Sequence, residues 1–308
     1  RAHDKIKRAR LAAAKKFSLE GVGRMAEKRR FINNTDIGQN FLIDESVVAY
    51  TVKRAAVTPD DVILEIGPGG GILTRGLLSA GPRALCAVEV DERLRDGLEA
   101  LASRDGRLRL FWGDAVRFDY RAELPETPTK IVANLPYHIT TPILWTFLEK
   151  LIPAGVGYML LMVQLESAER IASPERSRAR SPLGVTVEAM GGAEILRKVP
   201  PQAFRPQPRV NSALIEIKIE KNRELANDRT WRALLARSFT QRRKTLVNNW
   251  TAGYADIDRE RALAILDAHG LSATARAEEL PLEKWFELAK EPDFQIKEKG
   301  GVRNVVEP

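Results

Sequence analysis

The sequence contains few of the residues that build disulfide bonds and metal sites. Its 308 residues include one cysteine and three histidines, which excludes a disulfide framework within the chain and leads us to predict no metal centre. Cys86 lies in the apolar run ALCAVEV, where a packed core thiol is expected rather than a reactive one. A chain without disulfides is compatible with a reducing compartment, and we predict a cytoplasmic location.

Long apolar runs are also missing. No run of about 18 or more apolar residues occurs, so we predict no membrane-spanning segment and no membrane partner. Hydrophobic residues make up 44% of the chain, which is ordinary for a globular protein. The length suits one large domain and a smaller one.

The excess of positive charge is concentrated at the N-terminus. The formal net charge is +8, and residues 1–30 alone contain eleven Lys or Arg against three Asp or Glu. We interpret residues 1–36 as a basic arm. This arm faintly resembles an organellar transit peptide, but it has few serines and no cleavage-like end. A basic arm on a balanced body indicates a polyanionic partner, most often nucleic acid.

Short basic clusters interrupt the balanced remainder of the chain. Each cluster could contact nucleic-acid phosphates or could simply be a solvated face. The clusters are Arg176, Arg178 and Arg180; Arg205 and Arg209; and Arg242, Arg243 and Lys244.

Apolar and helical segments alternate from Asp60 onward. The runs DVILEIG, ALCAVEV, LRLFWGD and KIVANLP predict strands, with segments of helical spacing between the earlier ones. This alternation predicts an α/β fold with a parallel sheet covered on both faces. VGYMLLMVQL adds a buried strand. AEILRKVP and SALIEIKIE follow with only a Pro-rich link between them, which predicts antiparallel pairing at one sheet edge.

After about Lys221 the pattern becomes wholly helical, in TWRALLARSFTQRRKTLVNNW, DRERALAILDAHG and PLEKWFELAK. We therefore predict an α/β domain over residues 37–220 and a small all-helical C-terminal domain over 221–292. The final segment KEPDFQIKEKGGVRNVVEP is expected to be loose, and we count residues 293–308 as a tail.

The first chemical motif is LEIGPGGGILT, which follows a predicted strand and opens a predicted helix. Gly67, Gly69 and Gly71 would let a cofactor approach the backbone closely. The dinucleotide fingerprint G-x-G-x-x-G is not met, because Ile72 occupies its third glycine position. The series that begins at Glu65 and continues with these glycines instead looks like the nucleoside-cofactor loop of S-adenosylmethionine-dependent methyltransferases.

Acidic residues end the next two predicted strands. Glu89 in VEVD could accept hydrogen bonds from two ribose hydroxyls, and Asp114 in GDA could accept from an adenine amino group. Either residue could instead be an ordinary solvated strand end. Ligands of open α/β sheets bind beyond the carboxyl ends of the strands, so acids on successive strands favour a cofactor pocket.

Asn134-Leu135-Pro136-Tyr137 ends the fourth predicted strand. Alone it is compatible with an ordinary turn. It also suits an adenine N6 amine, whose lone pair is delocalised into the ring. The Asn134 side-chain oxygen and the Leu135 carbonyl could accept from its two hydrogens and favour a localised lone pair. Pro136 biases Leu135 towards an extended backbone, and Tyr137 offers a stacking face worth about 1–3 kcal/mol.

Together these motifs resemble the ribosomal RNA adenine N6,N6-dimethyltransferase family, in its bacterial small-subunit branch. The resemblance covers about residues 37–290. Its motifs, in family order, are GQNFLID, EIGPGGGILT, VEVD, GDA, NLPYHITTPI, VQLESAERIAS, VPPQAFRPQPRVNSALIEI and FTQRRKTLVNN. The first and last favour the small-subunit branch over the antibiotic-resistance branch that modifies large-subunit RNA.

The resemblance implies a Rossmann-like methyltransferase sheet, S-adenosyl-L-methionine as cofactor and the small ribosomal subunit with its 16S-type RNA as partner. The implied reaction is dimethylation of the N6 amines of two adjacent adenosines near the 3′ end of that RNA. We expect a monomer.

The resemblance also assigns roles to individual residues. The implied cofactor contacts are Asn40, Leu42, Gly67, Gly69, Glu89, Asp114 and Asn134. The implied catalytic residues are Asn134, Leu135, Pro136, Tyr137 and Phe204. The implied RNA contacts are Arg205, Arg209, Arg242, Arg243 and Lys244. Phe204 would close an aromatic clamp or be a packed loop residue, and residues 242–244 would face RNA or form a solvated helix face.

The chain departs from the family pattern in the loop SPERSRARSPLGV. The family usually carries a Pro-Gly-Ser-Lys-type loop with Tyr-Gly there, so RNA contacts by this loop are in doubt. Two other classes remain open. One is a mainly non-catalytic assembly or transcription factor on the same fold. The other is a DNA adenine methyltransferase, which typically carries proline where Leu135 stands.

Overall fold

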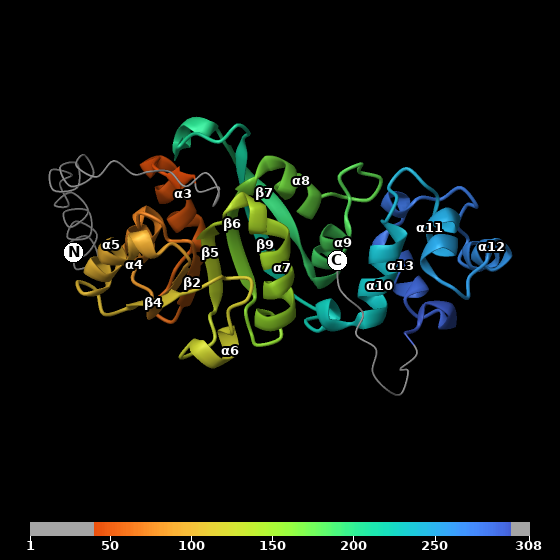
Figure 1. Ribbon diagram of the computed structural model, residues 1–308, viewed down its shortest axis with the longest axis horizontal. Coiled ribbons are helices and arrows are strands. Elements are labelled where there is room, and N and C mark those ends of the chain that lie inside the picture. Colours follow the sequence, from red (N-terminus) through yellow and green to blue (C-terminus); the bar gives the residue numbers. More distant parts are fainter. Residues whose placement is uncertain (1–39, 297–308) are drawn as a thin grey trace, which may run out of the picture. The chain divides into compact units, whose positions relative to one another are not determined.

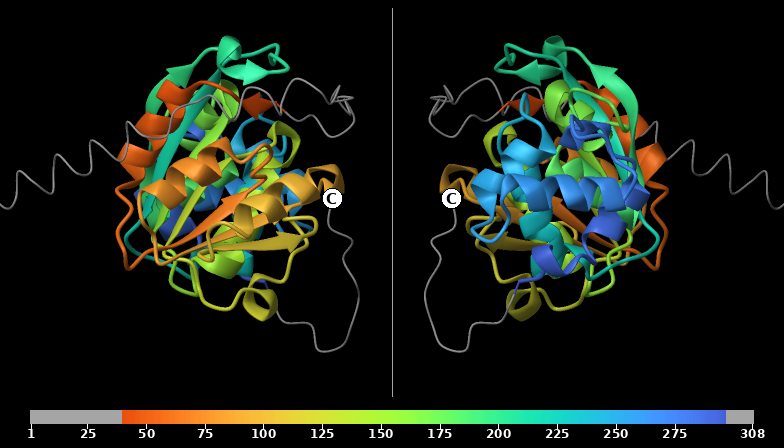
Figure 2. Two further views of the ribbon diagram at one scale, coloured as in Figure 1. Left: turned by 90° about the vertical axis from the view of Figure 1, so that its left-hand side faces the viewer. Right: turned by 90° about the vertical axis from the view of Figure 1, so that its right-hand side faces the viewer.

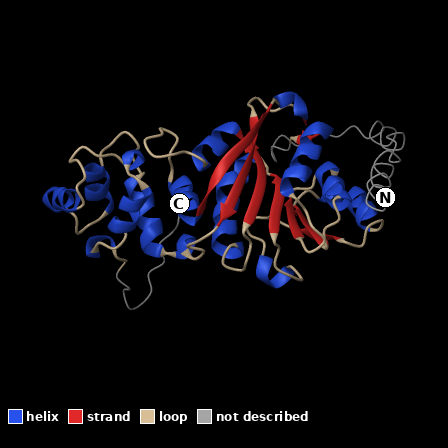
Figure 3. Ribbon diagram, turned by 180° about the vertical axis from the view of Figure 1, so that it is seen from behind, coloured by secondary structure: helices blue, strands red, loops and turns tan. Residues whose placement is uncertain are grey.

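The central element of the computed structural model is one continuous twisted sheet, drawn in red in Figure 3. The structure describes residues 40–296, so the predicted basic arm at 1–36 lies outside the described residues. The strands of this sheet are β2 (Val62–Ile66), β3 (Ala84–Glu89), β4 (Leu108–Trp112), β5 (Lys130–Asn134), β6 (Tyr158–Gln164), β7 (Gly191–Val199) and β9 (Ser212–Ile219). Their order in the sheet is β4-β3-β2-β5-β6-β9-β7.

The pairing confirms a parallel sheet with antiparallel pairing at one edge. Strands β2 to β6 pair in parallel, whereas β9 is antiparallel to both β6 and the edge strand β7. The link between β7 and β9 holds only the short turn η5 (Pro201–Ala203) and the two-residue strand β8 (Phe204–Arg205). A parallel crossover needs a longer connection, usually a helix, so this link forces the reversal.

The sheet order also defines a switch point. From β2 the chain moves outward through β3 and β4, then returns to β5 on the other side of β2. The neighbouring strands β2 and β5 therefore lead into loops that run in different directions at the carboxyl ends of the strands. Ligands of open α/β sheets bind in the crevice that such a divergence creates. In this chain those two loops carry the glycine motif and the NLPY motif.

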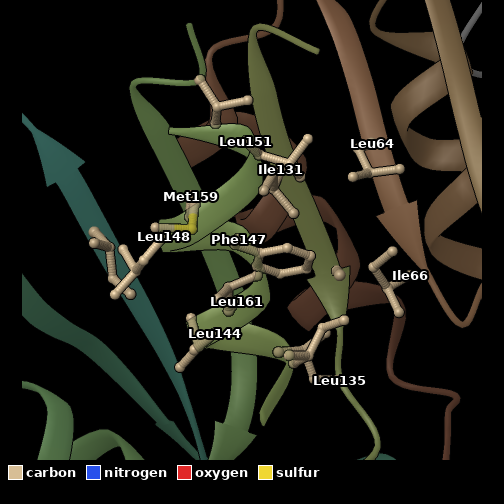
Figure 4. Close-up of a cluster of buried hydrophobic side chains, with 14 of the residues drawn as sticks. Leu64, Ile66, Ile131, Leu135, Leu144, Phe147, Leu148, Leu151, Met159 and Leu161 are labelled. Atoms are coloured by element: carbon tan, nitrogen blue, oxygen red, sulfur yellow. The ribbon is translucent and has the colours of Figure 1, made fainter. Parts of the chain in front are cut away.

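Helices cover both faces of the sheet (Figure 1). Ile63 and Val132 pack with residues of α3 (Glu45–Ala55) and α4 (Ile72–Ser79). Leu64 and Ile131, which alternate with them along the strands, pack with α7 (Thr140–Thr146) and the π-helical turn η4 (Phe147–Leu151). Figure 4 shows this second cluster around Phe147. Two apolar faces explain why the strands are hydrophobic runs without polar alternation.

The remaining segments of the α/β part are short. They are η2 (Glu92–Leu94), α5 (Arg95–Ala102), α6 (Tyr120–Glu123), η3 (Tyr137–Ile139), α8 (Leu165–Ile171) and α9 (Pro182–Met190). A separate two-stranded ribbon pairs β1 (Phe41–Leu42) antiparallel with β8. Cys86 is free and fully buried in the core, as predicted, and burial raises the pKa of its thiol to about 11.

The C-terminal part is all-helical, as predicted, and is blue in the right-hand view of Figure 2. Trp231, Trp250 and Trp285 are fully buried in its core. Its elements are η6 (Leu225–Asn227), α10 (Arg229–Ser238), α11 (Leu246–Gly253), α12 (Arg259–Ala268), η7 (Ala277–Glu279), α13 (Leu282–Leu288) and η8 (Pro292–Phe294).

Two predictions for this part need correction. TWRALLARSFTQRRKTLVNNW is not continuously helical: residues 239–245 form a turn, and the Thr245 side chain caps α11. The segment from Lys290 is not loose throughout, because Phe294 is fully buried and its ring lies 4.9 Å from that of Trp250. An aromatic ring that completes a core holds its segment in place, whatever the polarity of its neighbours. Within residues 40–296, no helix is long and apolar enough to cross a membrane.

Candidate cofactor and target-base site

The glycine loop and the NLPY motif lie side by side at the switch point. Strands β2 and β5 are neighbours, and Leu64 pairs with Ile131. A Cβ added to Gly67 would lie 3.8 Å from the ring of Pro136. The Gly67 N–H donates to the Val88 carbonyl across to β3 (2.9 Å). The fold therefore brings together two motifs that are far apart in the sequence.

The three glycines adopt backbone conformations that other residues rarely take. Gly67, Gly69 and Gly71 have φ values of +64°, +57° and +73°, in the left-handed region that glycine enters without steric cost. Gly69 is also crowded, because an added Cβ would lie 2.9 Å from Cδ1 of Phe41. The segment Asn40–Leu42, predicted to contact the cofactor, thus packs on the glycine loop. The side chain of Leu42 itself is buried.

Both predicted acids lie at the carboxyl ends of strands: Glu89 is the last residue of β3, and Asp114 follows β4. The Glu89 carboxylate is buried and accepts from the N–H groups of Gly69 (3.1 Å), Val90 (2.9 Å) and Asp91 (3.0 Å). Burial raises its pKa, and these backbone donors oppose the rise. Asp114 is half-exposed and accepts from the Val116 N–H (2.9 Å). Glu89 is thus preorganised against the glycine loop, whereas Asp114 shapes its own turn.

Glu65 begins the glycine motif, and its carboxyl group is a candidate site group for which no role was predicted. It is buried at the penultimate position of β2, and its Oε2 atom has no hydrogen-bond partner among the described residues. Burial raises its pKa to about 8; the side chain of Thr74 opposes this rise, and the negative charge of Glu89 adds to it. An acidic residue in a strand that is otherwise apolar was the available signal, since such groups are rarely buried without a partner.

Each residue of the NLPY motif is held by a different part of the chain. The Asn134 Nδ2 donates to the Asn40 carbonyl (3.3 Å). The Leu135 N–H donates to the Met162 carbonyl of β6 (3.0 Å), and its side chain is buried. Pro136 lies beside Gly67, where it would be 3.8 Å from an added Cβ.

Tyr137 begins η3, and its hydroxyl lies 2.6 Å from the Ser212 Oγ atom. Its ring is half-buried, and burial raises the pKa of the phenol while the Ser212 bond opposes the rise. The motif is thus a preorganised structure and not a free turn.

Phe204 does not present the free aromatic face that the clamp interpretation requires. It pairs with Leu42 in the β1–β8 ribbon, and its side chain is 1% exposed within the apolar cluster. In the described structure it corresponds to the alternative, a packed loop residue. Its burial follows from the ribbon, which brings the NFL segment over it, a pairing that local sequence does not reveal.

The predicted RNA-contacting cations differ in how they are engaged. Arg205 and Arg209 are exposed on and after β8. Arg243 and Lys244 are exposed on the turn between α10 and α11, so the predicted helix face is wrong. Arg242, on the same turn, points its guanidinium at backbone carbonyls of the unusual 173–181 loop, as described next.

The 173–181 loop packs against the C-terminal helical part. The Arg242 Nη2 donates to the carbonyls of Arg178 and Arg180. The Arg176 N–H donates to the Glu278 carbonyl (2.6 Å). Arg180 is fully buried and lies 2.8 Å from a Glu188 carboxylate oxygen. Arg180 is therefore a structural residue, whereas Arg176 and Arg178 take part through backbone atoms and are exposed, so the three arginines do not form one solvated face.

Metal ligands are not grouped in the part of the chain that the structure describes: no cluster of three or more His, Cys, Asp or Glu could hold an ion.

Residues 30–293 match the family model described as ribosomal RNA adenine dimethylase. A ribosomal RNA small subunit methyltransferase A from Alkaliphilus metalliredigens (strain QYMF) is 33% identical over 273 residues, which are 87% of this chain and 94% of that protein. A protein of the same name from Bradyrhizobium sp. (strain ORS 278) is 39% identical over 258 residues, or 83% and 88%.

Two solved structures share the fold. A dimethyladenosine transferase from Plasmodium falciparum superposes with a TM-score of 0.68 at 23% identity, covering 80% of this chain and 95% of that one. The 23S rRNA methyltransferase ErmE superposes with a TM-score of 0.61 at 27% identity, covering 82% and 98%.

Proposed function

Because the chain belongs to the ribosomal RNA adenine dimethylase family, we propose that it dimethylates the N6 amines of two adjacent adenosines near the 3′ end of small-subunit, 16S-type ribosomal RNA. The observation that carries this proposal is the pairing of β2 with β5, which places the glycine loop beside the NLPY motif, so close that a Cβ added to Gly67 would lie 3.8 Å from the Pro136 ring. The small-subunit branch is supported by relatives named small subunit methyltransferase A at 33% and 39% identity.

The family and the fold imply S-adenosylmethionine as the methyl donor. Two features of the site fit this molecule. The glycine loop is open at Gly70, where an added Cβ would meet nothing within 4 Å. The unpartnered carboxyl oxygen of Glu65 suits the ammonium group of the methionine portion.

In our proposal the cofactor is held from three sides. Glu89 accepts from the ribose hydroxyls and Asp114 from the adenine amino group. Asn40 and Leu42 close the site from the N-terminal segment. When bound, the cofactor supplies an electrophilic methyl group on a sulfonium.

The chain's own residues would prepare the target amine. The Asn134 side-chain oxygen and the Leu135 carbonyl accept its two hydrogens and favour a localised lone pair. Tyr137 stacks on the base. The bonds to the Asn40 and Met162 carbonyls hold Asn134 and Leu135 before substrate arrives. Alignment of this kind can supply ~7–11 kcal/mol. The nitrogen becomes acidic as it becomes cationic, so its proton can leave to water without a strong base.

For RNA we propose contacts by Arg205, Arg209, Arg243 and Lys244, which are exposed. We propose residues 37–220 as the methyltransferase domain and 221–292 as an RNA-binding domain. A monomeric state and a cytoplasmic location stay predictions.

A methyl-transfer assay tests the proposal. Labelled S-adenosylmethionine is incubated with unmethylated small subunits, large subunits, free RNA or duplex DNA, and products are identified by nucleoside mass spectrometry. We expect dimethyladenosine on small subunits, lost in Asn134→Ala. Label on large-subunit RNA or on DNA would assign the chain to one of the alternative classes. Tight binding of small subunits without any label would indicate a non-catalytic role.

A further inference from the structure

We infer that Ser212 is a positioning residue for the target base, acting through the hydroxyl of Tyr137. The inference rests on the function proposed above. Its basis is the 2.6 Å separation between the Tyr137 and Ser212 oxygens, in which either hydroxyl can donate. Both hydroxyls are neutral, so the pair can orient the Tyr137 ring without adding a charge to the site.

Ser212 is fixed more firmly than the residue that it holds. It is the first residue of β9, and its backbone pairs with Gln164 of β6 on one side and Val199 of β7 on the other. Its side chain is 0% exposed. Tyr137 lies beyond the end of β5, at the start of a three-residue turn. The hydrogen bond therefore fixes the position of Tyr137, which lies outside the sheet, relative to a strand of the sheet.

The hydrogen bond to Ser212 is made by the hydroxyl of Tyr137, at the far end of the ring, where it restricts the ring most. A tyrosine side chain has two rotatable torsions, and a bond to the hydroxyl at the far end of the ring restricts both. Stacking on a base requires a defined ring plane, because aromatic contacts depend on orientation. Both hydroxyls carry their protons at neutral pH, so the pair always contains a donor.

A double-mutant cycle measures this coupling. Ser212→Ala and Tyr137→Phe each remove one hydroxyl, and each is expected to lower kcat by about three- to tenfold, the rate equivalent of one neutral hydrogen bond. KM for S-adenosylmethionine should change little. The double variant should be no slower than the slower single variant, because both changes remove the same interaction. Ser212→Thr, which keeps a hydroxyl, should restore most of the rate.

Tyr158→Phe is the matched control. Tyr158 is also half-buried, and its hydroxyl donates to Glu216 (2.8 Å), but it lies at the opposite end of β6 from Gln164. This variant should lose stability without losing kcat. Fluorescence of 2-aminopurine placed at the target position adds a direct reading of stacking: quenching should weaken in Ser212→Ala and return in Ser212→Thr.

The outcomes separate the two proposals. A wild-type chain that transfers no methyl groups overturns the proposed function and this inference with it. An active wild type with Ser212→Ala at wild-type kcat and wild-type quenching overturns the inference alone. The inference is also overturned if the fold-losses of kcat in the two single variants multiply in the double variant. If Ser212→Ala does not fold, Tyr137→Phe and Ser212→Thr still decide the outcome by the same readouts.

Discussion

Adjacent glycines in the loop after β2 provide a controlled test of its geometry. Gly69 has φ +57°, and an added Cβ would lie 2.9 Å from the Phe41 ring. Gly70 lies outside the left-handed region, and an added Cβ there meets nothing within 4 Å. Gly69→Ala and Gly70→Ala therefore make the same chemical change, but only the first is opposed by the backbone and by a neighbour.

The expected destabilisation can be worked from these two terms. A non-glycine residue in the left-handed region costs roughly 1–2 kcal/mol, and the contact with Phe41 adds to this unless the ring moves. Both substitutions reduce the freedom of the unfolded chain by the same amount, about 0.4–1 kcal/mol, so this term cancels between them. The free energy of unfolding of Gly69→Ala should therefore be lower than that of Gly70→Ala by about 1–2 kcal/mol, and by more if the Phe41 ring cannot move. That difference corresponds to several degrees in Tm for a domain of this size.

Chemical denaturation of the two variants, followed by far-UV circular dichroism, gives the free energy difference directly. Calorimetric titration with S-adenosylmethionine then asks whether displacement of Phe41 weakens cofactor binding, as we expect for Gly69→Ala. Equal free energies of unfolding for the two variants would refute the assignment of a left-handed, crowded backbone to Gly69.

Three further predictions follow from the structure. Burial raises the pKa of Glu65 from 4.5 to about 8, so the unfolded chain loses this proton at lower pH than the folded chain, and the free energy of unfolding should fall as pH rises between those values. The fall should be smaller in Glu65→Gln, and parallel pH profiles of the two proteins would contradict the assignment. Arg242→Ala should lower Tm and increase hydrogen exchange in the 173–181 loop. Arg243→Ala should leave Tm unchanged and reduce by about 1 the slope of log binding constant against log salt concentration for RNA. Identical effects of the two variants would refute the distinction. Phe294→Ala should destabilise the chain by about 3–5 kcal/mol in denaturant unfolding, because its ring is fully buried, and a loss below about 1 kcal/mol would restore the loose-tail interpretation.

The features that the sequence predicted are those with a local physical signal. Alternation of apolar strands and helical segments indicated the covered parallel sheet, because periodicity and length reflect which faces are buried. The glycine spacing indicated the loop after β2, since Gly67 and Gly69 adopt conformations that glycine enters without cost. The Pro-rich link indicated the antiparallel pairing of β9, since it is too short for a crossover.

The features that only the tertiary structure decided are contacts between distant segments. Nothing near Phe204 in the sequence indicates that β1 pairs with its strand and buries its ring. Arg180 belongs to a basic cluster, yet packing of its loop buries it completely. The hydroxyls of Tyr137 and Ser212 meet because β9 returns antiparallel beside β6. Local propensity thus determined the elements and the motifs at their ends. Which side chains meet, and which are removed from solvent, depends on long-range packing that no short stretch of sequence encodes.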